Sequence, residues 1–188
     1  VRGGVSSWIH DYMLAMPQHR FVLWVIGAEA KNKGKFLYEL PPNVVEINEI
    51  FLDDAMQMEA KKGDIFRFSE DEVEAHKNLI TCSNPEWSVL YELYNTRQIS
   101  VLSFLMSESF LNILIDLSHE HYQYVSFAEL FHSQRSMLLP MLYLMRQRIP
   151  DADIYHSTST GYGGLLGAMS SSIKKRPLVV TEHGIYTR

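Results

Sequence analysis

The segment from Asp153 to Arg188 constrains the fold of this chain more than any other part of the sequence. It reads DIYHSTSTGYGGLLGAMSSSIKKRPLVVTEHGIYTR, a strand, a glycine-rich turn, a helix and a second strand. This order predicts two parallel strands that are neighbours in one sheet, joined by a helix. Ligands of open α/β sheets bind outside the carboxyl ends of the strands. His156 and His183 follow the two predicted strands, so we expect both to project toward the same crevice.

Upstream segments extend the same pattern. Val5–Met16 has its apolar residues at helical spacing and predicts an amphipathic helix. Phe21–Ile26 is a continuous apolar run, typical of a strand covered on both faces, and Val44–Phe51 alternates as a second strand does. The fold class is therefore α/β, a parallel sheet with helices on both faces, interrupted by a helical insertion at about 53–148.

The insertion is predicted to be rich in helices. Pro85–Gln98 and Ile99–His119 contain many Leu, Tyr and Phe residues at helical spacing. Ser126 with Glu129 predicts a capping box that opens a further long helix. Pro140 is expected to interrupt and kink that helix, because proline removes one backbone hydrogen bond.

Composition bounds the cellular context. The chain has 188 residues, is 46% hydrophobic and carries a net charge of −5, which suits a globular domain and gives no reason to expect a nucleic-acid partner. Its single cysteine, Cys82, forms no internal disulfide, which favours a reducing cytoplasm. The start at Val1 enters a loop with no strand before it, so we interpret the chain as an internal fragment of a longer protein.

The pair Gly3-Gly4 precedes the first predicted helix. Glycines at such a position let a ligand approach the backbone, and the free N–H groups of a helix start favour an anion such as a diphosphate. A tight turn without a ligand explains the same two residues, and both interpretations stay open.

A second glycine cluster follows the strand that carries His156. The run from Gly161 does not match the dinucleotide-binding fingerprint G-x-G-x-x-G, because Leu166 occupies the last position. The turn still suits a helix N-terminus that faces a sugar or a phosphate. Equally, Gly163 and Gly167 are four residues apart and would permit close packing of the helix on the sheet.

Histidines supply the main candidates for chemistry. A lone histidine is usually structural, but two at the ends of neighbouring strands favour a functional role for His156, His183 or both. Glu182 beside them would orient an imidazole, bind a hydroxyl or serve as a solvated carboxylate. His119 and His121 form an H-x-H pair whose spacing places them on different faces of a helix, which favours solvent exposure over metal binding. No metal site is expected.

Several motifs together resemble one known family. They are RGGVSSW at 2–8, ELPPNV at 39–44, the residues AD-YH-STGY-GLLGA within 152–168, and TEHGIYTR at 181–188. They resemble the N-terminal domain of the PelF-type glycosyltransferases, cytoplasmic family-4 retaining enzymes associated with Pel exopolysaccharide biosynthesis. The resemblance is closest at both ends and in the early linker, whereas the middle shares only its helical, leucine-rich character.

This resemblance implies a GT-B architecture, in which two Rossmann-like domains face each other across the active site. Residues 1–188 would form the N-terminal, acceptor-side domain, truncated at both ends. The C-terminal donor-binding domain would lie beyond Arg188, so the fragment alone is expected to be inactive. The implied substrates are a UDP-sugar, with UDP-glucose as the suggested donor, and a saccharide acceptor. Components of a membrane polysaccharide synthase are implied partners, which would hold the protein at the inner membrane peripherally.

The resemblance also implies roles for individual residues. Many family-4 enzymes carry H-x-H at the first of the two strand ends, but here Thr158 stands in place of the second histidine, so the histidine role falls to His156 or His183. By matching position, Gly3 and Gly4 would face the donor diphosphate and the acceptor. His156, Ser157 and Thr158 would line the sugar site, and Glu182, His183 and Gly184 would lie on the neighbouring strand end. Gly161, in the glycine-rich turn described above, is counted among the donor-binding candidates.

Two other functions fit the same sequence. The second interpretation is a non-catalytic scaffold, which docks on a membrane polysaccharide synthase through its helical insertion. A generic flavodoxin-like nucleotide-binding domain is the third interpretation, although the sequence shows no dedicated flavin motif. Binding and turnover of a sugar nucleotide separate the first function from the other two.

Overall fold

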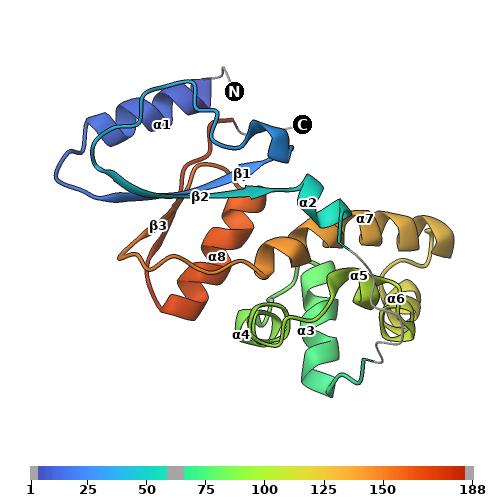
Figure 1. Ribbon diagram of the computed structural model, residues 1–188. Coiled ribbons are helices and arrows are strands. Elements are labelled where there is room, and N and C mark those ends of the chain that lie inside the picture. Colours follow the sequence, from blue (N-terminus) through green and yellow to red (C-terminus); the bar gives the residue numbers. More distant parts are fainter. Residues whose placement is uncertain (1–3, 59–65, 185–188) are drawn as a thin grey trace. The chain divides into compact units, whose positions relative to one another are not determined.

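The computed structural model describes residues 4–58 and 66–184, a mixed α/β structure with parallel strands and helices (Figure 1). The chain divides into two compact units. Unit 1 joins residues 1–54 to residues 149–188, and unit 2 comprises residues 55–148. Each unit is considered by itself below.

Unit 1 contains two parallel strand pairs. Strand β1 pairs with β2, and β3 pairs with β4. The second pair confirms that the strands before and after the glycine-rich turn are parallel neighbours. The elements of unit 1 are α1 (Gly4–Leu14), β1 (Phe21–Gly27), the 3-10 turn η1 (Ala30–Asn32), β2 (Val44–Phe51), β3 (Tyr155–Ser157), α8 (Tyr162–Lys174) and β4 (Leu178–Val180), with α2 (Asp53–Met56) at the boundary between the units.

Glycines set how closely α8 packs on the β3–β4 pair. A Cβ atom added at Gly163 would lie 2.9 Å from the Ser157 hydroxyl oxygen, and one at Gly167 would lie 2.8 Å from a methyl carbon of Leu178. Both distances are shorter than a carbon atom tolerates, so a side chain at either position would force the side chain of Ser157 or Leu178, or α8 itself, to shift. These contacts agree with the interpretation that the two glycines permit close packing of the helix, while a ligand at the helix N-terminus stays a prediction.

Helix α1 contacts the other face of the same strand pair. Successive residues of a strand point to opposite faces, so His156 faces away from Ser157 and α8. The rings of Trp8 and Tyr12 on α1 lie against the His156 ring. Asn43, before β2, fixes the end of α1, because its side-chain amide donates to the carbonyl oxygens of Met13 at 2.9 Å and Met16 at 3.0 Å.

Strand β1 is less buried than its apolar sequence predicts. Every residue from Phe21 to Gly27 is half-buried, so the expectation of a strand covered on both faces is wrong for this structure. The reason is the size of the sheet: within the described residues β1 pairs with β2 alone. The second strand, Val44–Phe51, has the bounds that the sequence predicts.

In unit 2, all the secondary structure of the described residues is helical. Ser69 and Glu72 form a reciprocal capping box at the start of α3, which the sequence analysis did not single out. At the start of α7, the Ser126 hydroxyl accepts from the Glu129 backbone N–H, which is one of the two hydrogen bonds of the capping box predicted there. Its elements after α2 are α3 (Glu70–Ile80), α4 (Trp87–Tyr91), the π-helical segment η2 (Glu92–Thr96), α5 (Val101–Leu105), α6 (Glu108–Glu120) and α7 (Phe127–Met145).

Two expectations for this unit are corrected. The predicted single helix over Ile99–His119 is two helices, because the Ser107 hydroxyl accepts from the Phe110 N–H and so starts α6 anew. Helix α7 continues through Pro140 rather than being interrupted there. Across residues 4–58 and 66–184, no helix is both long and apolar enough to span a membrane.

Candidate functional site

The two strand-end histidines meet at one tryptophan. The Trp8 ring centroid lies 6.2 Å from that of His156 and 4.7 Å from that of His183, and both contacts are edge-to-face. Trp8 also stacks on Tyr12 at 5.1 Å, and Tyr12 contacts His156 at 5.3 Å. Helix α1 thus supplies an aromatic surface that both imidazoles touch. We call these four residues and Thr181 the strand-end site.

His156 is held by its neighbour strand. Its Nε2 atom lies 2.7 Å from the Thr181 hydroxyl oxygen. The Thr181 N–H donates to the Ser157 carbonyl at 2.9 Å, which continues the β3–β4 ladder and fixes where that hydroxyl lies. Burial lowers the pKa of His156, which favours the neutral form of its imidazole. A neutral imidazole offers one donor and one acceptor to a ligand, and here the Nε2 atom is engaged by Thr181.

Glu182 acts on the backbone of the glycine-rich turn. One oxygen of its carboxylate accepts from the Thr160 N–H at 3.2 Å. Glu182 therefore ties the end of β4 to the loop between β3 and α8, a role that the sequence analysis did not consider. His183 is exposed beside it, with one edge against Trp8.

Three glycines of unit 1 are open on their side-chain side: Gly4 and Gly161 at the starts of α1 and α8, and Gly184 after β4. A Cβ atom added at any of them would meet no atom within 4 Å apart from the adjoining backbone. Helix α8 begins after Gly161 without a side-chain cap, so its first N–H groups are not satisfied by a capping side chain. Gly3 lies outside the described residues. A ligand can reach the backbone at these positions, which is what the predicted contact with a phosphate or a sugar requires.

Ser157 and Thr158 differ in their surroundings. Ser157 is buried beneath α8, and its hydroxyl donates to the Ser159 carbonyl at 2.6 Å. It points to the face of the strand opposite to that of His156. Its implied contact with the sugar stays a prediction. Thr158 is half-buried at the end of β3, where the strand passes into the turn.

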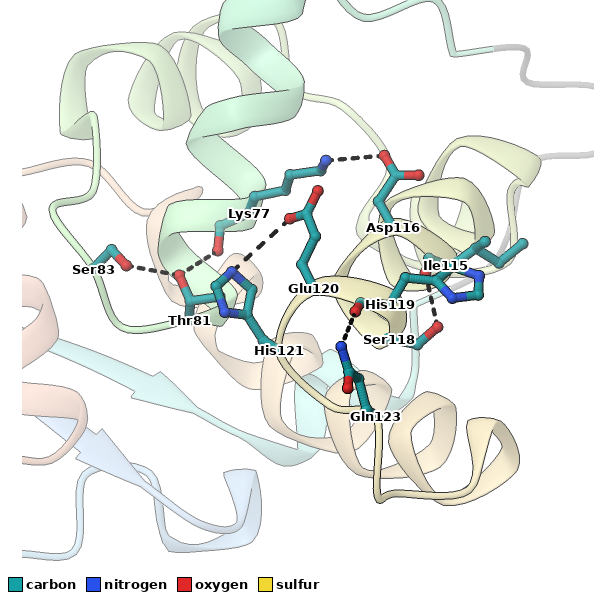
Figure 2. Close-up of polar contacts among 10 residues, drawn as sticks. All are labelled: Lys77, Thr81, Ser83, Ile115, Asp116, Ser118, His119, Glu120, His121 and Gln123. Atoms are coloured by element: carbon teal, nitrogen blue, oxygen red, sulfur yellow. Dashed lines mark hydrogen bonds and ion pairs between the residues drawn. The ribbon is translucent and has the colours of Figure 1, made fainter.

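The H-x-H pair lies in unit 2, at the end of α6 (Figure 2). The side chains of His119 and His121 are exposed and point in different directions, as their spacing predicts. The His121 Nε2 atom lies 3.9 Å from a carboxylate oxygen of Glu120. The His119 carbonyl oxygen accepts from the side-chain amide of Gln123 at 2.9 Å. Within the described part of the chain, no group of three or more His, Cys, Asp or Glu side chains is placed to hold a metal ion.

A buried histidine of unit 2 was missed by sequence reasoning. His76 is 1% exposed, its Nδ1 lies 2.6 Å from the Glu72 carbonyl, and its Nε2 lies 2.7 Å from the Tyr94 hydroxyl. A carbonyl only accepts, so Nδ1 carries the proton and Nε2 accepts from Tyr94. Burial is the largest cause that lowers the pKa of His76 to about 4. The four-residue spacing from Glu72 was the available signal, but it is common in helices.

The strand-end site also contains three residues to which the sequence gave no individual role. Trp8 and Tyr12 belong to the predicted amphipathic helix Val5–Met16, and Thr181 opens the motif TEHGIYTR. Trp8 and Tyr12 are four residues apart, which puts their aromatic rings on one side of α1. Which strand that side would contact is a tertiary feature, so the sequence did not connect them to His156.

The comparisons with known proteins identify a family. Residues 1–188 match the family described as "Domain of unknown function (DUF3492)", and the chain belongs to it. This domain is found in glycosyltransferase-family proteins. No curated protein and no solved structure matches the chain.

Proposed function

We propose that this member of the DUF3492 family is the N-terminal, acceptor-side domain of a retaining glycosyltransferase with GT-B architecture. The reaction is transfer of a sugar from a UDP-sugar, UDP-glucose in the first instance, to a saccharide acceptor in exopolysaccharide biosynthesis. The occurrence of this domain in glycosyltransferase-family proteins supports the class of reaction. The resemblance to PelF-type enzymes supports the finer assignment and a Rossmann-like description of unit 1.

The observation that carries the proposal is the meeting of His156 and His183 at Trp8. Both histidines come from the carboxyl ends of two parallel strands that are neighbours in one sheet. Ligands of α/β proteins bind at such strand ends. His76 is enclosed by the core, whereas His183 is exposed and His156 is only half-buried, so a ligand at these strand ends can approach both rings.

The chemistry requires stabilisation of the leaving group. The bond between the anomeric carbon and the diphosphate oxygen breaks, and its electron pair leaves with UDP. The acceptor hydroxyl oxygen bonds to the same face of that carbon, which retains the configuration, and its proton passes to the departing diphosphate. No protein nucleophile takes part. His156 and His183 are assigned to hydrogen bonds with the donor sugar, where they favour the positively charged, oxocarbenium-like transition state over the ground state.

We assign the backbone N–H groups at the N-termini of α1 and α8 to hydrogen bonds with the diphosphate. Negative charge grows on the diphosphate as the bond breaks, and donors aimed at that charge act where it develops. Neither α1 nor α8 carries an acidic residue in its first turn, and α8 has no side-chain cap. The open backbone at Gly4 and Gly161 gives an anion access to these N–H groups.

The first experiment is an assay of UDP release by the protein at its natural full length, with a panel of UDP-sugars. The test variant is the double substitution His156→Ala, His183→Ala. The matched control is His119→Ala, His121→Ala, which removes two exposed histidines from unit 2. We expect release with one sugar, loss of that release in the test variant, and normal release in the control.

Two results would contradict the proposal. Equal release by the test variant and the control would remove the strand-end site from the reaction. Absence of both UDP release and nucleotide binding would favour the alternative function, a non-catalytic scaffold on a membrane polysaccharide synthase.

A further inference from the structure

The loop between β1 and β2 exposes an unusual set of side chains. Every residue from Lys31 to Leu40 is exposed, and we call this segment the 31–40 loop. Large apolar side chains belong in the core, and a contiguous exposed group of them marks an interaction surface. The exposed fractions are 42% for Phe36, 54% for Leu37, 39% for Tyr38 and 39% for Leu40.

The loop is fastened to the rest of unit 1 at several points. The Gly34 N–H donates to both carboxylate oxygens of Glu49 on β2, each at 3.1 Å. On α1, the His10 Nε2 donates to the Glu39 carbonyl at 3.1 Å, and the His10 ring lies 5.1 Å from the Tyr38 ring. The backbone of the loop is therefore held by β2 and α1 while its apolar side chains remain open to solvent.

Positive charge accompanies the apolar side chains. The lysines of the loop are at 31, 33 and 35, directly before Phe36, in a chain whose net charge is −5. Lys31 pairs with Glu29 at 2.8 Å. Lys33 and Lys35 form no ion pair within the described residues. The ammonium groups of Lys33 and Lys35 are therefore available to bind negatively charged groups of another molecule.

We propose that the 31–40 loop is a peripheral contact site for a bilayer surface that contains anionic lipids. Phenylalanine, leucine and tyrosine side chains partition into the boundary between headgroups and acyl chains, while lysine ammonium groups reach the lipid phosphates. Each lysine near such a surface adds about 1 kcal/mol of attraction. A site for an acidic protein would use the lysines, but it would not require the four exposed apolar side chains that follow them in the loop. This inference goes beyond the proposed function and does not rest on it.

The test is co-sedimentation of the full-length protein with lipid vesicles. One set of vesicles contains phosphatidylcholine alone, and in the other about a third of the lipid is phosphatidylglycerol, which supplies the negative surface. We expect binding to the anionic vesicles and weak binding to the neutral ones. Binding to the anionic vesicles should fall as salt is raised, since the Debye length shortens from about 10 Å at 0.1 M to about 3 Å at 1 M.

Matched variants locate the contact. Lys33→Gln with Lys35→Gln should lower the partition coefficient about thirtyfold, which corresponds to about 1 kcal/mol for each lysine. The control, Arg20→Gln with Arg176→Gln, removes the same charge from exposed positions elsewhere in unit 1 and should bind almost normally. Phe36→Ser with Leu37→Ser should lower binding at least about tenfold. Its control is Leu14→Ser with Ile154→Ser, at apolar positions that are 50% and 58% exposed.

The outcomes are decisive in both directions. Equal binding to the two kinds of vesicle, or equal losses in the loop variants and their controls, would overturn the proposal. So would the absence of vesicle binding, which would leave a protein partner as the occupant of the loop. Hydrogen exchange of residues 31–40 in the unsubstituted protein, with and without anionic vesicles, tests the same contact without any substitution, and we expect protection confined to this loop.

Discussion

The two units use histidine in opposite ways. In unit 2, His76 is enclosed by the rings of Phe68, Tyr94 and Phe104, and both of its nitrogen atoms have protein partners. In the strand-end site of unit 1, His156 has one bonded nitrogen and His183 is exposed. Burial lowers the pKa of both His76 and His156, so a lowered pKa does not separate the two settings.

Access separates them. A histidine whose nitrogen atoms are both bonded inside a core has nothing left to offer a ligand, whatever its pKa. A histidine at the open end of a strand keeps hydrogen-bonding capacity on a side that a ligand can reach. Substitutions in unit 2 should therefore change stability, and substitutions in the strand-end site should change turnover.

The largest effect is expected from His183→Ala in the full-length protein. Loss of a group that stabilises the transition state lowers turnover by about 100- to 1000-fold. Because His183 is exposed, the free energy of unfolding should change by less than about 0.5 kcal/mol. Steady-state UDP release together with thermal unfolding measures both quantities. Normal turnover would remove His183 from the mechanism, and a large loss of stability would make it a structural residue like His76.

The second prediction concerns the acid sensitivity of unit 2. His76 has a pKa of about 4 when folded and about 6.5 when unfolded, so between these values the unfolded chain binds more protons. The free energy of unfolding should therefore fall as the pH is lowered from 6.5 to 4, by about 3 kcal/mol. Hydrogen exchange of unit 2 amides at several pH values would measure the loss.

A double substitution isolates that contribution. His76→Leu with Tyr94→Phe replaces both hydrogen-bonding partners by apolar groups, which removes the titrating imidazole without stranding a polar atom. The loss of stability between pH 6.5 and 4 should then be smaller by about the His76 contribution. An unchanged pH dependence would show that other groups cause it.

The third prediction is the effect of Tyr94→Phe alone. The substitution leaves the His76 Nε2 buried without its donor, which should cost about 1–3 kcal/mol of stability. Turnover per folded molecule should not change. Urea unfolding and the UDP-release assay give the two readouts, and a specific fall in turnover would show that the His76 core is coupled to the strand-end site.

The smallest effect is expected from Thr181→Val. This substitution removes the hydroxyl bonded to His156 in unit 1, as Tyr94→Phe removes the hydroxyl bonded to His76 in unit 2. Valine keeps the β-branched shape that suits a strand, so stability should be nearly unchanged. Loss of the hydrogen bond to His156 should lower turnover about fivefold, the equivalent of one ordinary hydrogen bond. Unchanged turnover with a clear loss of stability would place Thr181 among the structural residues.

Patterns local to the chain predicted much of unit 1. The order strand, turn, helix, strand in the C-terminal segment correctly indicated a parallel β3–β4 pair, because a helical connection leaves few other arrangements. The alternation of Val44–Phe51 predicted β2 to its end residues. The burial of β1 was predicted wrongly, because the sequence of one strand does not show how many other strands pair with it.

The helical unit shows the same limit. The sequence indicated helices over Ile99–His119 but not the break at Ser107, where a serine side chain caps α6 in competition with helix continuation. It placed His119 and His121 correctly at an exposed helix end, because the spacing of two residues fixes their relative direction. It passed over His76, whose burial depends on aromatic side chains from several helices.

By itself, the sequence determined the α/β class, the parallel pair of strands that carries His156 and precedes His183, and the glycine-rich turn between the two strands. Tertiary structure decided what those residues meet. Contacts between α1 and the β3–β4 pair bring Trp8 to both histidines, and strand geometry turns Ser157 under α8 while His156 faces α1. The physical reason is that the backbone geometry of a helix or strand sets the relative directions of side chains close in sequence. Packing between distant segments then decides whether each side chain faces another side chain, the core or solvent.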